Sequence, residues 1–180
     1  MIYLLENPER EQERTLARRL LARGLEREYG IKGEPLIETA PLGKPYLADY
    51  PWIHFNYSHC TKGILCGISE EEIGVDIEGI IPYKERFAAR ICHRRELSMV
   101  LEAEDRDAML TAVWTGKESY MKYLGLGLRR DLREIDLSEA LMRQVPLDGV
   151  YLHSRLNGEY GLCVCCREPS VIIHKVKKDS

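Results

Sequence analysis

The chain has 180 residues, of which 44% are hydrophobic, and its 26 Lys and Arg against 29 Asp and Glu leave a net charge of -3. This apolar content is enough for a core, in one domain or in two small ones. The slight acidity gives no general attraction to nucleic acid or to an anionic membrane, so we expect neither as a partner.

Targeting and redox signals point to the cytoplasm. The apolar run at residues 2–5 is too short for a signal peptide, and no segment approaches the length of a membrane span. Cys60, Cys66 and Cys92 are scattered, and Cys163, Cys165 and Cys166 lie in one strand-like run, so the six cysteines do not make two C-x-x-C motifs. We therefore expect free, buried thiols in a reducing compartment rather than a disulfide or a zinc site.

The first part of the chain is predicted to combine short strands with one long helix. An amphipathic helix is expected over residues 9–29, because leucines recur on one face and Gly30 ends the pattern. A turn-rich stretch over 33–47 presents Lys44. The predicted strands of this part are residues 1–5, 53–60 and 63–68.

The second part repeats this alternation. Helical patterns are expected over 85–100 and 105–123, followed by the flexible Gly125-x-Gly127 segment. Asn157-Gly158 predicts a tight hairpin turn, because both residues tolerate positive φ angles. The predicted strands of this part are residues 75–78, 150–156, 160–166 and 171–176. The pattern indicates an α+β fold with two similar halves, residues 1–72 and 73–180.

The Gly74-Val75-Asp76-Ile77-Glu78 stretch combines strand chemistry with two acids. Since side chains alternate along a strand, Asp76 and Glu78 project from one face and the apolar residues from the other. Two acids on one face suit either a solvated rim or a divalent cation such as magnesium.

A second motif lies in the helix predicted over 105–123. Trp114, Glu118 and Lys122 follow each other at intervals of four, so they share one helix face, while Lys117 points elsewhere. A Glu and a Lys at this spacing also form an ordinary surface ion pair, so the motif alone does not establish a site.

Four stretches in this order resemble one family, the 4'-phosphopantetheinyl transferases of the surfactin-synthetase-activating type. They are Gly43-Lys44-Pro45, Phe55-Asn56-Tyr57-Ser58-His59, Gly74-Val75-Asp76-Ile77-Glu78 and Trp114-x-x-Lys117-Glu118-x-x-x-Lys122. The resemblance spans most of the chain. It implies two pseudo-symmetric halves, each a small, mainly antiparallel sheet packed on a long helix, with coenzyme A in the cleft between them.

The resemblance also implies an activity: transfer of the phosphopantetheine arm of coenzyme A to a serine of an acyl or peptidyl carrier protein, with release of adenosine 3',5'-bisphosphate. Such carriers serve polyketide, nonribosomal peptide or fatty acid biosynthesis, and the sequence does not say which. Asp76, Glu78 and Glu118 would hold magnesium, which manganese could replace. This ion would neutralise charge at the pyrophosphate, and Lys122 would steady the departing bisphosphate. Glu118, directly or through a water at the metal, or else Glu96, would take the serine proton.

The family pattern places Lys44, Ser58 and His59 around the adenosine and its 3'-phosphate. Arg14 and Thr15 match an Arg-Thr pair that opens the first long helix in relatives. A basic segment that usually precedes this helix in relatives is nearly absent here, so either Arg10 or Arg14 compensates for it or the affinity for coenzyme A is lower. We expect a monomer.

Two other classes stay open at this point. One is a magnesium-dependent phosphohydrolase or nuclease, which the net acidity disfavours because a nuclease needs a basic groove. The other is a family member that binds coenzyme A or a carrier without turnover.

Overall fold

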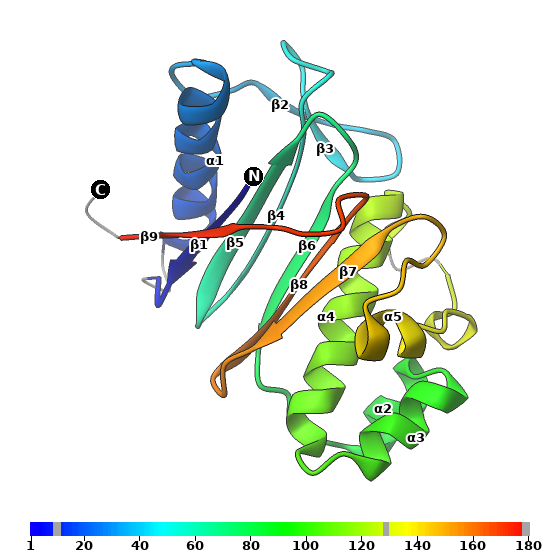
Figure 1. Cartoon of the computed structure of the whole chain (residues 1–180). Coiled ribbons are helices and arrows are strands. Elements are labelled where there is room, and N and C mark those ends of the chain that lie inside the picture. Colours follow the sequence, from blue (N-terminus) through cyan, green and yellow to red (C-terminus); the bar gives the residue numbers. More distant parts are fainter. Residues whose placement is uncertain (9–11, 128–129, 178–180) are drawn as a thin grey trace.

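The computed structural model describes residues 1–8, 12–127 and 130–177. The chain folds into helices and largely antiparallel sheets (Figure 1), which confirms the predicted α+β class. The strands are β1 Ile2–Glu6, β2 Ile37–Thr39, β3 Pro45–Leu47, β4 His54–Cys60, β5 Gly63–Ser69, β6 Gly74–Gly79, β7 Tyr151–Leu156, β8 Tyr160–Cys166 and β9 Ile173–Val176. The helices are α1 Glu13–Tyr29, α2 Glu85–Ile91, α3 Arg94–Glu102, α4 Arg106–Leu124, the 3-10 helix η3 Leu132–Glu134 and α5 Ser138–Arg143.

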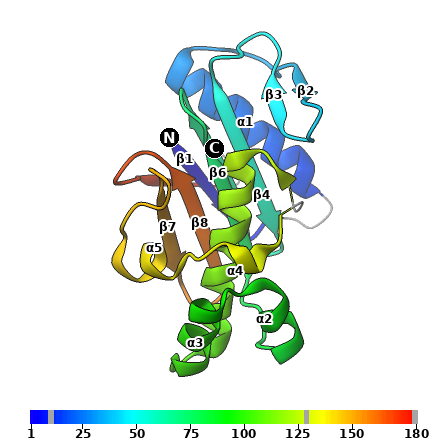
Figure 2. The same cartoon turned by 90° about the vertical axis from the view of Figure 1, so that its right-hand side faces the viewer.

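Two sheets carry a long helix each. The first sheet has the strand order β4-β5-β1-β9 and packs on α1, and the second has the order β6-β8-β7 and packs on α4. Figure 2 shows α1 and α4 on different sides of the strands, with α2 and α3 beyond one end of α4. A small β2–β3 hairpin lies beside the first sheet.

Alternation along the strands explains these layers. In β1, Tyr3 and Leu5 pack in the core that contains the α1 leucines, while Ile2 and Leu4 share a core with Val75 and other residues of the second sheet. The two sheets therefore face each other through apolar side chains, and each uses its other face to hold a helix.

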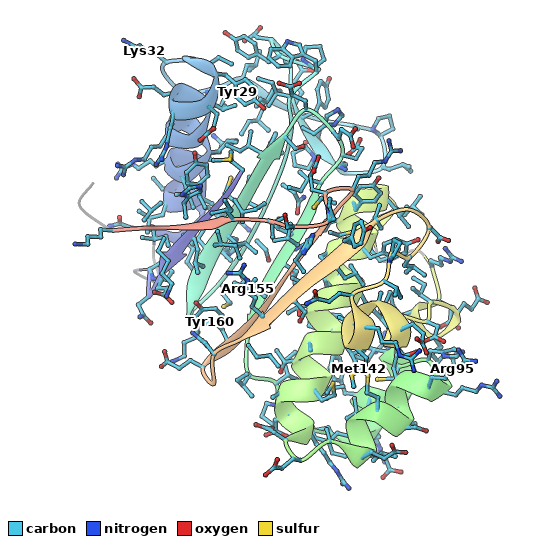
Figure 3. The ribbon with its side chains drawn as sticks, in the orientation of Figure 1. Tyr29, Lys32, Arg95, Met142, Arg155 and Tyr160 are labelled. Carbon is cyan, nitrogen blue, oxygen red and sulfur yellow. The ribbon has the colours of Figure 1, made fainter. Side chains whose placement is uncertain are left out.

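The last strand departs from the predicted division at residue 72. β9 lies at the end of the chain, yet it pairs in parallel with β1, so the second half contributes a strand to the first sheet. Tyr160 of β8, labelled in Figure 3, donates a hydrogen bond of 2.7 Å to Glu6 at the end of β1. Backbone pairing thus joins the two halves of the chain within the first sheet, and a buried tyrosine links the second sheet to the first.

Most predicted elements are present, with differences at the ends and one break. α1 begins at Glu13, while residues 9–11 of the predicted helix lie outside the described residues. The single helix predicted over 85–100 is wrong: α2 ends at Ile91 and α3 starts anew. A capping box causes this restart, because the His93 side chain accepts from Arg95 N and the Glu96 carboxylate accepts from His93 N at 2.7 Å.

Two further expectations concern cysteines and membrane spans. All six cysteines are free, and all but the half-buried Cys60 are buried, as predicted. Within the described ranges, no helix combines the length and the apolar character needed to cross a membrane.

Candidate active site

The close packing of α4 on β6 creates the candidate site. Gly74 permits it: a Cβ on Gly74 would lie 2.0 Å from the Ser119 carbonyl oxygen and 2.4 Å from Tyr123 N, both on the α4 backbone. With α4 this close, Lys122 Nζ donates to Asp76 Oδ1 at 2.6 Å and to Val75 O at 3.1 Å. The two sequence motifs therefore meet in space.

Asp76 is the centre of the cluster and is 2% exposed. Its Oδ1 accepts from Lys122 and, at 2.8 Å, from the Ser58 hydroxyl of β4. Its Oδ2 is buried and has no hydrogen-bond partner in the structure. An unpaired carboxylate oxygen in a buried position is costly, and a bound cation would satisfy it.

Glu78 and Glu118 complete the acidic group. Burial, followed by the charge of Asp76, raises the pKa of Glu78 to about 7, and a hydrogen bond from the Trp114 side chain partly offsets this. Burial and then Asp76 also raise the pKa of Glu118, against the opposing charge of Lys122. The charge of Asp76 thus acts on both Glu78 and Glu118, so the three predicted acids lie in one region.

The donor chemistry of this region fits a hard divalent cation. Carboxylate oxygens are the ligands that magnesium prefers, and a cation would relieve the repulsion that raises both glutamate pKa values. Within the part of the chain that the structure describes, no three metal-binding side chains are already gathered closely enough to enclose an ion.

A pocket of about 310 Å³ lies next to the cluster and is lined by both halves of the chain. Its lining includes Lys44, Asn56, Tyr57, Lys122, Gly125 and Gly127. Lys44 Nζ donates to Tyr123 O at 3.1 Å, near the C-terminal end of α4, and also donates to the Glu72 carboxylate. Two of the residues predicted for coenzyme A, Lys44 and Lys122, therefore share this pocket.

Ser58 and His59 are not brought together. They are neighbours in β4, so their side chains point to opposite faces: Ser58 to Asp76, and His59 to α1, where its Nδ1 lies 3.0 Å from Glu13 Oε2. The exposed Arg14 and Thr15 follow Glu13 in the first turn of α1, near His59. Arg10 lies outside the described residues.

Glu96 lies apart from the acidic cluster, in a buried ion pair. Glu96 and Lys117 are both 0% exposed, and Glu96 Oε2 is 2.7 Å from Lys117 Nζ. The remaining carboxylate contacts are backbone N–H groups, those of Leu137 at 2.8 Å and His93 at 2.7 Å. Burial raises the pKa of Glu96, and Lys117 together with these N–H groups offsets part of the rise. Both oxygens are in use, so this arrangement suits a structural role better than a base.

A wider pocket of about 860 Å³ lies between α2, α4 and η3. It combines cationic with aromatic side chains, including Arg86, Arg90, Arg130, Arg133, Phe87 and Trp114. Trp114 also contacts Glu78, so this pocket adjoins the acidic cluster. The sequence reasoning did not single out these arginines, because they are spread over 48 positions of the chain and converge only through the fold.

Comparisons with known proteins show which sequences this chain resembles. The sequence model of the "4'-phosphopantetheinyl transferase superfamily" matches residues 72–165. The chain is 30% identical over 171 residues to 4'-phosphopantetheinyl transferase Sfp of Bacillus subtilis, and the aligned region covers 88% of this chain and 76% of that protein. It is also 30% identical to 4'-phosphopantetheinyl transferase psf-1 of Bacillus pumilus, over 91% of this chain and 75% of that protein. The similarity extends to a yeast protein, the L-aminoadipate-semialdehyde dehydrogenase-phosphopantetheinyl transferase of Saccharomyces cerevisiae, at 30% identity over 76% of this chain and 50% of that protein.

Proposed function

The chain belongs to the 4'-phosphopantetheinyl transferase superfamily, and we propose that it transfers the 4'-phosphopantetheine group of coenzyme A to a serine of an apo acyl or peptidyl carrier protein. The observation that carries this proposal is that the acidic cluster and the pocket share Lys122. The Asp76, Glu78 and Glu118 carboxylates and Lys122 form one cluster, and Lys122 also lines the pocket that contains Lys44. A pyrophosphate held there would lie between cations and carboxylates.

Magnesium fits the acidic cluster, with Asp76, Glu78 and Glu118 as its holders. The ion, which manganese could replace, supplies charge neutralisation at the pyrophosphate when it is bound. Asp76 contributes an oxygen that is otherwise unpaired, and the Ser58 hydroxyl fixes the orientation of this carboxylate at 2.8 Å. We therefore assign Ser58 to positioning Asp76 as well as to the nucleotide side of the site.

The reaction requires a group that accepts the proton of the serine hydroxyl and a cation that stabilises the leaving group. The carrier serine oxygen forms a bond to the β-phosphorus, the bond from this phosphorus to the bridging oxygen breaks, and adenosine 3',5'-bisphosphate leaves with that oxygen. Glu118, whose pKa burial raises, takes the proton of the serine hydroxyl. Lys122 stabilises the negative charge that develops on the bridging oxygen. Glu96 is enclosed in its ion pair and supports α4 through Lys117.

Coenzyme A would occupy the pocket of about 310 Å³ with its adenosine end toward Lys44. His59, Arg14 and Thr15 lie on the α1 side of β4 and offer a second basic region for phosphate. Tyr57 of β4 lines the pocket and shares its face of this strand with His59. The phosphates of one donor would therefore run from the pocket along β4 to this region.

The carrier protein would dock at the pocket lined by Arg86, Arg90, Arg130 and Arg133. This pocket adjoins Glu78 through Trp114, so a serine on the docked carrier comes near the acidic cluster. Arginine with aromatic neighbours suits an acidic, amphipathic segment. We propose a monomer that acts in the cytoplasm without nucleic acid or membrane, in keeping with the net charge of -3 and the free cysteines.

The test is the intact mass of an apo carrier protein after incubation with this protein, coenzyme A and magnesium. A gain of the phosphopantetheine mass, dependent on coenzyme A, is the expected result. Binding of coenzyme A with no change in mass across a panel of acyl and peptidyl carriers would instead identify a non-catalytic member of the family.

A further inference from the structure

Two of the basic residues proposed for the nucleotide, His59 and Lys44, each lie beside a carboxylate of this chain. His59 Nδ1 lies 3.0 Å from Glu13 Oε2, and Lys44 donates to Glu72 Oε2. Carboxylates and phosphates bind ammonium and imidazolium groups by the same charge-assisted hydrogen bonds. A phosphate that reaches these cations therefore meets a competitor.

Glu72 is the clearer of the two cases, because it has two basic partners. One oxygen accepts from Lys44, and the other lies 3.3 Å from His54 Nδ1. The Glu72 side chain is 44% exposed, whereas that of Lys44 is 17% exposed. The carboxylate can therefore swing into solvent, while the lysine stays in the pocket wall.

Lys44 has a second anchor that does not depend on Glu72. Its ammonium donates to Tyr123 O at 3.1 Å, at the end of α4 where the helix dipole favours a cation. Removing the Glu72 charge would leave Lys44 in place with more of its charge available. The ion pair with Glu72 therefore weakens phosphate binding by Lys44, but it is not required to hold the lysine in position.

We propose that Glu72 sets the affinity and selectivity for the donor by competing with its phosphate for Lys44. This inference rests on the proposed function, in which Lys44 receives the adenosine end of coenzyme A. The wild-type protein then distinguishes coenzyme A from dephospho-coenzyme A less sharply than its lysine would allow, because the 3'-phosphate has to displace a resident carboxylate.

The experiment compares Glu72→Gln with Glu71→Gln by calorimetric titration with coenzyme A and with dephospho-coenzyme A. Glu71 is a matched control, since it is the adjacent residue, carries the same charge and lies 3.9 Å from Arg167 on the exposed surface. For Glu72→Gln we expect coenzyme A to bind roughly three- to tenfold more tightly, with a smaller gain for dephospho-coenzyme A. Glu71→Gln should change neither dissociation constant by more than about twofold.

Two further variants make the result specific. In a Lys44→Met background, Glu72→Gln should lose its effect, because the contested cation is gone. Glu72→Ala removes the same charge and serves if the Gln variant does not fold, as judged by its melting curve.

Equal or weaker binding of coenzyme A by the folded Glu72 variants would overturn the inference, as would a gain that persists without Lys44. The carrier-mass assay on the wild type separates this failure from failure of the proposed function. If the wild type modifies carriers while Glu72→Gln gains nothing, the inference alone is wrong. If the wild type neither binds coenzyme A nor modifies a carrier, both are wrong.

Discussion

Gly74→Ala is expected to abolish most activity without touching a reacting group. The added methyl would lie 2.0 Å from the Ser119 carbonyl oxygen and 2.4 Å from Tyr123 N, where ordinary contacts begin at 3.4 Å. Both neighbours are backbone atoms of α4, so the whole helix has to move by more than about 1 Å. We expect a loss of about 1–3 kcal/mol in the free energy of unfolding.

This shift should also separate Glu118 and Lys122 from Asp76, since α4 carries the first two residues. A displacement of about 1 Å costs on the order of a hundredfold in turnover when reacting groups are held in a fixed geometry. The assay is the rate of carrier modification, with urea denaturation for stability. Gly79→Ala is the control, because a Cβ at this position on the same strand has its nearest neighbours at 3.8 and 3.9 Å. Wild-type rate and stability in Gly74→Ala would refute the claim that tight α4 packing builds the site.

The remaining predictions concern single side chains. Lys117→Met leaves Glu96 buried without its counter-ion, so denaturation should show a loss of about 3–5 kcal/mol in the free energy of unfolding; unchanged stability would contradict the buried pair. Folded Glu96→Gln should keep kcat within about tenfold of wild type, and a larger loss at equal stability would restore Glu96 as the base. Lys122→Ala should lower kcat more than it raises the KM for coenzyme A, whereas an effect on KM alone would make it a binding contact. His59→Ala should reduce the kcat/KM preference for coenzyme A over dephospho-coenzyme A by about tenfold, and an unchanged ratio would remove His59 from the site. Because the pKa of Glu78 is raised to about 7, magnesium must displace a proton from this carboxyl below that pH. The magnesium affinity, measured by calorimetry, should therefore fall as the pH drops from 8 to 6 in the wild type, and less steeply in Glu78→Gln.

The sequence predicted those parts of the site that depend on local periodicity. Strand alternation placed Asp76 with Glu78, and helix spacing placed Glu118 with Lys122 and turned Lys117 away from them. The structure joins these two pairs through the contact between Lys122 and Asp76. The same alternation points Ser58 and His59 to opposite faces of β4, which the expectation that both lie around the adenosine and its 3'-phosphate did not take into account.

The parts that were missed depend on contacts between distant segments. The parallel pairing of β9 with β1 joins residues more than 160 positions apart, and no local sequence pattern predicts this pairing. The Glu96–Lys117 pair had no signal in the sequence either, because an acid and a base on separate helices look like surface residues until packing buries them. Glu72 follows two other glutamates and has no local signal of a partner, and only the fold brings Lys44 to it.

The most direct test of the central claim is the rate of phosphopantetheine transfer by Asp76→Ala, measured by carrier mass with magnesium and coenzyme A in excess. Asp76 is the buried acid that contacts Lys122 and influences both glutamates, so its removal should disable the whole cluster. We predict a loss of about a hundredfold or more in kcat, in a protein whose circular dichroism spectrum matches that of the wild type. A folded Asp76→Ala protein that transfers phosphopantetheine at the wild-type rate would contradict the assignment of the reaction to this site.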